Sequence, residues 1–300
     1  MVVAKRSGVP FVFNVQDIFP DVAIEVGALS GEKVIAAARR LELMVYRGAD
    51  AVTVLSDELS DNVSEKLGPR ASRGPSPAPG DKTEVVTIPN FVDTNRIVPL
   101  NRENAYRREF GLTGRTVVMY AGNVGYSQSL ELMVDAAREC ETSHPNAVFV
   151  INGGGSGLAE LKRLAEGLSN IVFVGLQPKE RLAEVAAAAD IHVVALRRGL
   201  ARSSVPSKLY TILAAARPVV ASIDEGTEVG RVISQSGAGL AVPPQDSGAF
   251  VSAITKLLSS PEQQVAMGEA GRSFVERWLS PAECAQAYEE LFSRLIDGHR

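Results

Sequence analysis

The stretch that decides the fold is Val205-Pro-Ser-Lys-Leu-Tyr-Thr-Ile-Leu-Ala-Ala-Ala-Arg-Pro-Val-Val-Ala-Ser222, which predicts a helix followed directly by a buried strand. Pro206 has a preset φ angle and Ser207 can cap free amide groups, so we expect a helix to begin here. The Leu- and Ala-rich segment continues the helix until Pro218 ends it, and the apolar residues beyond Pro218 are typical of a strand in a sheet covered on both faces.

The start of this helix has two interpretations. A helix N-terminus carries unpaired N–H groups and a partial positive charge, and Lys208 adds a full one, so the pattern suits a phosphate or diphosphate. An ordinary capped helix with a solvated lysine has the same residues. This stretch alone does not separate the two.

The composition is that of a globular protein long enough for two domains. The 300 residues are 45% hydrophobic and carry a net charge of −4, which makes nucleic acid an unexpected main partner. Cys140 and Cys284 are too few for a disulfide framework, and no Cys/His spacing predicts a metal site. We therefore expect a cytoplasmic setting. No apolar run reaches the roughly 18 residues of a membrane span, so contact with a membrane would be peripheral.

Strand-like and helix-like segments alternate along the first ninety residues. In order they are a strand at 9–15, a helix at 30–48, a strand at 49–55, a helix at 57–67, a mobile surface loop at 68–82 and a strand at 84–88. Ligands of α/β sheets lie past the C-terminal ends of parallel strands, which makes Gln16 and Asp17 candidates for a cleft. The alternative for these two residues is a helix cap followed by a turn.

A second series of strands and helices follows a polar link at 94–112. Strands are predicted at 115–121, 147–151, 170–174, 190–196, 219–222 and 237–243, with helices between them and three more at 247–258, 261–278 and 280–296. The glycine-bearing turn at 122–129 has the geometry that brings backbone amides close to a phosphate, although any βα loop can use glycine. Gly153–Gly155 suits either a close approach to a ligand or a flexible loop. The basic run 197–202 suits either a phosphate contact or a solvated loop.

Five strings of this sequence carry a family resemblance: VPSKLYTILAAARPVVAS, YAGNVGYSQSLELMVDAA, VQDIFPD, ADAVTVLSDELSDNV and PNFVD. They resemble glycosyltransferase family 4, of GT-B fold, and in particular the bacterial surface-polysaccharide branch that transfers N-acetylfucosamine-like sugars. The resemblance implies two Rossmann-like α/β domains with parallel sheets. Residues 1–94 would form a partial N-terminal acceptor-side domain, 95–275 the nucleotide-sugar-binding domain, and 276–300 a helix crossing back. Relative to a complete enzyme of this fold, about a hundred N-terminal residues are expected to be missing.

The resemblance also implies which residues form the sites. Gln16 and Asp17 would lie in the active-site cleft. The donor would contact residues of four segments: Gly122, Asn123, Gly125 and Gln128; Gly175 and Leu176, which receive the base; Arg202; and Ser207 with Lys208, which face the diphosphate. The sequence departs from the family where it has Gln16 for histidine, Asn123 and Gln128 for basic residues, and Ser203 and Thr211 for a pair of glutamates. Lys208 would then carry most of the charge that neutralises the diphosphate.

The implied function is transfer of a sugar from a nucleoside-diphosphate donor to a lipid-linked or polysaccharide acceptor. The donor would be a UDP-linked N-acetylated sugar, the anomeric configuration would be retained, and neither a metal nor another cofactor would take part. Two alternatives stay open: a non-catalytic nucleotide-sugar-binding protein, and, fitting these strings less well, a UDP-sugar epimerase. We expect the protein in the cytoplasm, with peripheral contact to the inner face of the plasma membrane.

Overall fold

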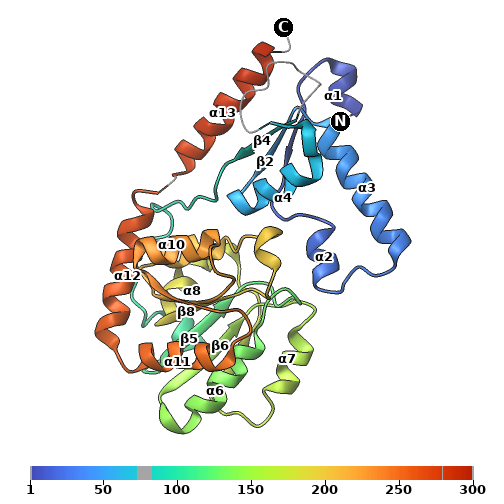
Figure 1. Cartoon of the computed structure of the whole chain (residues 1–300). Coiled ribbons are helices and arrows are strands. Elements are labelled where there is room, and N and C mark those ends of the chain that lie inside the picture. The colour runs from blue at the N-terminus through green and yellow to red at the C-terminus, as the bar shows by residue number, and fades with distance from the viewer. Residues whose placement is uncertain (1, 73–82, 279, 299–300) are drawn as a thin grey trace. The chain divides into compact units, whose positions relative to one another are not determined.

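The computed structural model describes residues 2–72, 83–278 and 280–298, and its chain divides into two units (Figure 1). Unit 1 consists of Met1–Phe91, Gly199–Val205 and Leu279–Arg300, and unit 2 of Val92–Arg198 and Pro206–Trp278. The prediction from sequence assigned 199–205 to the C-terminal domain, whereas its contacts group it with unit 1.

Unit 1 is built on a four-stranded parallel sheet of order β1-β2-β4-β3. The strands are β1 Val12–Asn14, β2 Ala51–Val54, β3 Ala71–Ser72 and β4 Thr83–Thr87. All four residues of β2 are buried, because strands lie on both sides of it and helices cover its faces. β3 falls inside the segment predicted as a mobile loop, so that prediction is wrong for 68–72, while 73–82 lie outside the described residues. A strand of two residues is too short for sequence periodicity to reveal.

The helices of unit 1 are α1 Val2–Ser7, α2 Asp21–Glu25, α3 Glu32–Gly48, α4 Asp57–Leu67, the 3-10 helices η1 Gly68–Arg70 and η3 Leu200–Arg202, and α13 Pro281–Gly298. α4 begins where the sequence predicts, because the Ser56 hydroxyl accepts a hydrogen bond from the Leu59 amide. Three polar contacts attach α13 to this unit's sheet: Asn14 donates to the Tyr288 hydroxyl at 2.5 Å, this hydroxyl donates to Thr53 at 3.5 Å, and Arg294 pairs with Glu84 at 2.6 Å.

Unit 2 contains a six-stranded parallel sheet of order β10-β9-β8-β5-β6-β7. The strands are β5 Thr116–Ala121, β6 Ala147–Asn152, β7 Ile171–Val174, β8 Ile191–Ala195, β9 Val219–Ser222 and β10 Gly239–Val242. The helices are α5 Ala105–Glu109, α6 Glu131–Ser143, α7 Leu158–Leu164, η2 Lys179–Arg181, α8 Leu182–Ala188, α9 Lys208–Ala214, α10 Glu228–Ser236, α11 Ser247–Leu258 and α12 Pro261–Val275. Buried apolar residues on both faces of the sheet form the core.

The stretch that opened the sequence argument forms α9 and β9, as predicted. The helix is short, because Ala216 adopts a positive φ of 54° two residues before Pro218. Ser207 does not cap it: its backbone is already helical at φ −62° and ψ −21°, and its side chain makes no capping hydrogen bond. A capping side chain normally requires an extended backbone, so the predicted cap is wrong.

Candidate functional site

At the C-terminal edge of the unit 2 sheet, the loop after β6 packs closely against the loop after β5, and the contact is made through glycines. A Cβ on Gly153 would lie 1.8 Å from the Gly122 carbonyl oxygen, and one on Gly155 would lie 2.4 Å from the Val124 oxygen. Val124 also donates to the Gly154 carbonyl at 2.8 Å and accepts from the Gly157 amide at 2.9 Å. These glycines therefore allow the loop after β6 to support the loop after β5.

Lys208, the first residue of α9, lies against the loop after β5. Its Nζ is 3.6 Å from the centroid of the Tyr120 ring, and a Cβ on Gly122 would lie 2.7 Å from this Nζ. The Tyr120 hydroxyl donates to the Asn123 carbonyl at 2.6 Å, which fixes the ring below the loop. Glycine at position 122 thus leaves room for the ammonium group at the edge where parallel sheets bind ligands.

The Lys208 ammonium has no anionic partner in the part of the chain that the structure describes. Within residues 2–72, 83–278 and 280–298 it forms no ion pair, and its side chain is partly buried. Burial lowers the pKa of Lys208 to about 7. A desolvated cation is held at a cost that an anion bound beside it would offset, so this position is suited to a phosphate group.

The polar side chains of the loop after β5 mostly serve the loop itself. Gln128 accepts from the Gly125 amide at 3.0 Å and donates to the Ser127 hydroxyl at 2.7 Å, which closes the turn. Asn123 is exposed beside this turn. The Ser129 hydroxyl is buried and has no hydrogen-bond partner within the described chain. Neither Asn123 nor Gln128 supplies charge here.

The turn after β7 lies on the same edge of the same sheet. β6 separates β7 from β5, so the ends of β5 and β7 are about 10 Å apart. Gly175 has open space around its Cα, its carbonyl accepts from Gln177 at 3.1 Å, and Leu176 is 77% exposed. Gly175 and Leu176 are therefore accessible at a spacing that a nucleotide can cover from Lys208.

The arginines of the basic run separate in the structure. Arg202 belongs to unit 1, where it pairs with Glu65 at 2.8 Å. Arg198 donates to the Pro244 carbonyl at 3.1 Å. Arg197 donates its amide to Ser127 at 2.9 Å and its guanidinium lies 3.5 Å from Glu131. Sequence reasoning named the run, but only the structure shows that Arg197 is the member beside the loop after β5.

The N-terminal candidates lie just past β1 in unit 1. Gln16 and Asp17 are exposed; Gln16 donates to Asn14 at 2.5 Å, and Asp17 forms an antiparallel bridge with Ser204. The loop is thus fastened to the 199–205 segment.

Sequence reasoning missed a carboxylate in this region. The Ser203 hydroxyl donates to Glu25 at 2.7 Å, and burial raises the pKa of the Glu25 carboxyl. Because 178 positions separate Ser203 from Glu25, no local pattern signals the contact.

Among the described residues, no group of three or more His, Cys, Asp or Glu side chains is arranged to hold a metal ion. Among the helices of the described ranges, none combines the length and the apolar character needed to cross a membrane.

Comparisons with known proteins agree on the class of fold and family. Residues 102–274 match the family model described as glycosyl transferases group 1. The chain is 27% identical over 254 residues to the probable glycosyltransferase WbjE of Pseudomonas aeruginosa, covering 83% of this chain and 60% of that protein. It is 29% identical over 285 residues to the putative colanic acid biosynthesis glycosyl transferase WcaI of Escherichia coli K12, covering 92% of this chain and 66% of that one. The chain thus spans less than two thirds of either relative's length.

The solved structures that resemble it establish the architecture. HepE of Anabaena, in complex with UDP, superposes with a TM-score of 0.76 at 14% identity, covering 97% of this chain and 74% of that one. WaaG, a glycosyltransferase involved in lipopolysaccharide biosynthesis, gives a TM-score of 0.70 at 16% identity, covering 94% and 75%. The fold is of GT-B type with two Rossmann-like domains, as expected. Because the family model spans more than half of the chain, this protein belongs to the glycosyl transferases group 1 family.

Proposed function

We propose that this protein transfers a sugar from a nucleoside-diphosphate donor, a UDP-linked N-acetylated sugar, to a lipid-linked or polysaccharide acceptor. The observation that carries the proposal is the Lys208 ammonium, which has no carboxylate partner in the described chain and lies at the ligand edge of the unit 2 sheet. The names of WbjE and WcaI and the UDP bound to HepE support the choice of reaction and of donor.

In this proposal the protein acts by positioning the donor and by stabilising the leaving diphosphate. The diphosphate accepts a charge-assisted hydrogen bond from Lys208 and lies against the Gly122 backbone, where a side chain would block it. The base contacts Gly175 and Leu176. Arg197 is a second cation at the same edge of the sheet, in place of the basic residues that the family carries near Asn123 and Gln128. Gln16 and Asp17 face the acceptor, and the sugar is transferred with retention.

Calorimetry with UDP and UDP-N-acetylated sugars, followed by a transfer assay with lipid-linked saccharides, tests this function. We expect UDP to bind, and to bind more tightly than uridine, which lacks the diphosphate. Binding without transfer to any acceptor would favour the non-catalytic alternative. No saturable UDP binding at millimolar concentration would contradict both.

We also propose that helix α3 of unit 1 contacts the membrane surface. Its exposed apolar residues Val34, Leu41 and Met44, which are 50–57% exposed, lie beside the exposed basic residues Lys33, Arg40 and Arg47. At 100° per residue all six fall on one side of the helix, so apolar and basic rows run side by side. This pattern suits a bilayer with anionic headgroups.

Co-sedimentation with vesicles tests the membrane contact. We expect binding to vesicles with anionic lipid, weaker binding to neutral ones, and a loss on replacing Leu41 and Met44 by serine. The control replaces Val265, an equally exposed apolar residue of unit 2, by serine. Equal binding by all three proteins would refute the assignment of α3 and leave the transfer reaction untouched.

A further inference from the structure

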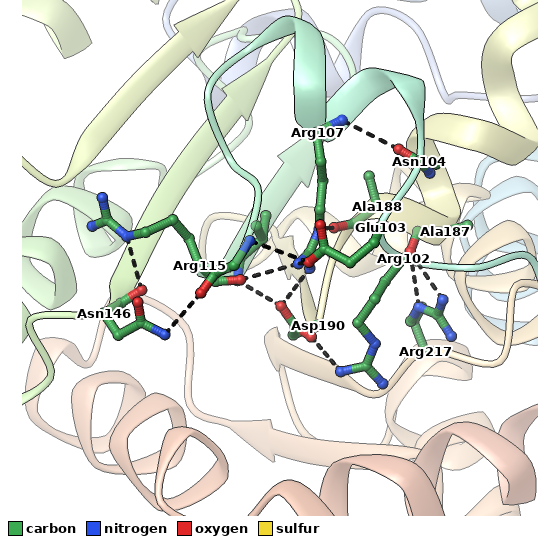
Figure 2. Close-up of polar contacts among 12 residues, drawn as sticks. Arg102, Glu103, Asn104, Arg107, Arg115, Asn146, Ala187, Ala188, Asp190 and Arg217 are labelled. Atoms are coloured by element: carbon green, nitrogen blue, oxygen red, sulfur yellow. Dashed lines mark hydrogen bonds and ion pairs between the residues drawn. The ribbon is translucent and has the colours of Figure 1, made fainter.

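A cluster of buried charges lies at the opposite edge of the unit 2 sheet (Figure 2). Asp190 immediately precedes β8 and is 5% exposed. One carboxylate oxygen accepts from Arg102, and the other accepts from Arg107 at 2.5 Å and from the Val117 amide at 2.7 Å. Three donors therefore already use the negative charge of Asp190.

Arg217 enters the same region with no carboxylate of its own. It is 8% exposed and donates to the backbone carbonyls of Ala187, Ala216 and Leu100 at 2.8–3.1 Å (Figure 2 shows the Ala187 contacts). In the described ranges no carboxylate is hydrogen-bonded to it. Burial and the neighbouring Arg102 lower the pKa of Arg217 to about 10. The carbonyls at a helix end supply only about half a negative charge, so Arg217 is not paired with a full opposite charge.

A cavity of about 540 Å³ opens beside these arginines. Arg102, Arg217 and Arg272 line it, together with the exposed Glu269 and Ser273, while Pro99 and Val265 give it an apolar wall. Arg272 is largely engaged, since it pairs with Glu276 and donates to three carbonyls. Arg102 uses one nitrogen for Asp190 and its side chain is 39% exposed, so it has donors free for a ligand. The volume is that of a small-molecule site.

This cavity is separate from the C-terminal edge of the sheet, where we propose that the sugar donor binds and which we call the donor edge. Asp190 and Pro218 precede β8 and β9, whereas Gly122 and Lys208 lie beyond the C-terminal ends of the strands. The five residues of β8 place about 16 Å of sheet between the two edges. A nucleotide that contacts Lys208 and Gly175 does not reach the cavity.

We propose that the cavity binds a small phosphorylated molecule as an effector, distinct from the sugar donor. Its phosphate accepts hydrogen bonds from Arg102 and Arg217, and its organic part contacts Pro99 and Val265. Phosphate is the matching group because Arg102 has free donors, Arg217 keeps one N–H beyond its four bonds to carbonyls, and both guanidinium groups line the same cavity. The inference does not depend on glycosyl transfer.

The test uses the whole chain with two probes, inorganic phosphate and phenyl phosphate, titrated at constant ionic strength and followed by NMR or calorimetry. Lys208→Met first removes the cation of the donor edge, and binding of both probes should persist within about twofold in that variant. Phenyl phosphate should bind more tightly than inorganic phosphate because of the apolar wall.

The matched pair Ser273→Glu and Ser273→Gln then tests the location in the Lys208→Met background. Ser273 is exposed, so both variants should fold. The glutamate brings a like charge to the mouth of the cavity and should weaken binding at least about tenfold, whereas the isosteric glutamine should not. Equal affinity of the two variants would overturn the proposal. So would the absence of saturable binding at about 10 mM probe.

Discussion

Replacing Lys208 by methionine tests the centre of the functional argument. Methionine keeps an unbranched apolar stem that can pack on the Tyr120 ring, where the Lys208 Nζ now lies 3.6 Å from the ring centroid. It removes the positive charge alone. The variant should therefore keep its fold while losing the cation that we propose for the diphosphate.

The size of the effect follows from the environment of this ammonium. A hydrogen bond to a charged group contributes about 1.5–3 kcal/mol, so UDP affinity should fall roughly tenfold to a hundredfold. Thermal stability of the free protein should not fall, because the variant no longer desolvates a charge that lacks an ion-pair partner among the described residues. Calorimetry with UDP and thermal unfolding measure the two quantities on the same samples.

A pH series tests the same group independently. Burial lowers the pKa of Lys208 to about 7, and a bound diphosphate must raise it again. Binding above pH 7 therefore requires uptake of nearly one proton, and affinity should fall as pH rises above 7. Calorimetry near pH 8 in buffers of different ionisation enthalpy counts the protons, well above the phosphate pKa of about 6.

Three outcomes would contradict the assignment of Lys208 to the diphosphate. If Lys208→Met binds UDP within twofold of the parent, the diphosphate lies elsewhere. Proton uptake near pH 8 that persists in the variant would mean that another group titrates. A large loss of stability in the variant would show that the cation stabilises the fold, although no described residue forms an ion pair with it.

Gly153→Ala should destabilise the protein by about 1–3 kcal/mol or more, because the added Cβ would lie 1.8 Å from the Gly122 carbonyl oxygen. Chemical unfolding measures the loss of free energy, and a loss under about 0.5 kcal/mol would contradict the contact between the two loops. Arg202→Ala should change UDP affinity less than threefold, because Arg202 pairs with Glu65 in unit 1. Calorimetry measures the affinity, and a loss larger than that of Lys208→Met would place the anion site at Arg202. Burial lowers the pKa of His192 from its ordinary value near 6.5 to about 4. The stability that the buried neutral imidazole contributes is therefore present above pH 6.5 and lost as pH falls toward 4. Unfolding of His192→Gln should not show this loss of stability in acid, and a pH profile unchanged from the parent's would exclude His192 as its source.

Most of the fold could be predicted from the sequence because its elements have strong local patterns. The buried strands β5, β6 and β8 are mostly apolar and rich in valine, and α4 has both a capping serine and an acidic first turn. The elements that escaped prediction are short: α1, α2 and β3 have two to six residues each. Their conformation depends on neighbours far away in the sequence.

The candidate site was less predictable than the fold, because some of its contacts join residues that are far apart in the sequence. A lysine after Pro-Ser at a helix start, and a glycine after a strand, are local signals, and the structure brings Lys208 and Gly122 together. The partners of Arg202 and Ser203 are not local, since Glu65 and Glu25 come from other elements. Because Arg202 is close to Lys208 in the sequence, we predicted that the two residues share a site. In the structure Arg202 instead forms its ion pair in unit 1, whereas Lys208 belongs to unit 2.

The path of the chain between the units has a practical consequence. The backbone passes from one unit to the other four times, after Phe91, Arg198, Val205 and Trp278. A fragment cut only at the first and last of these points would carry residues 199–205 without the surface on which they pack. Expressing unit 2 alone therefore calls for a short artificial loop joining Arg198 to Pro206, and a protease cut at any single crossing leaves the two units covalently linked.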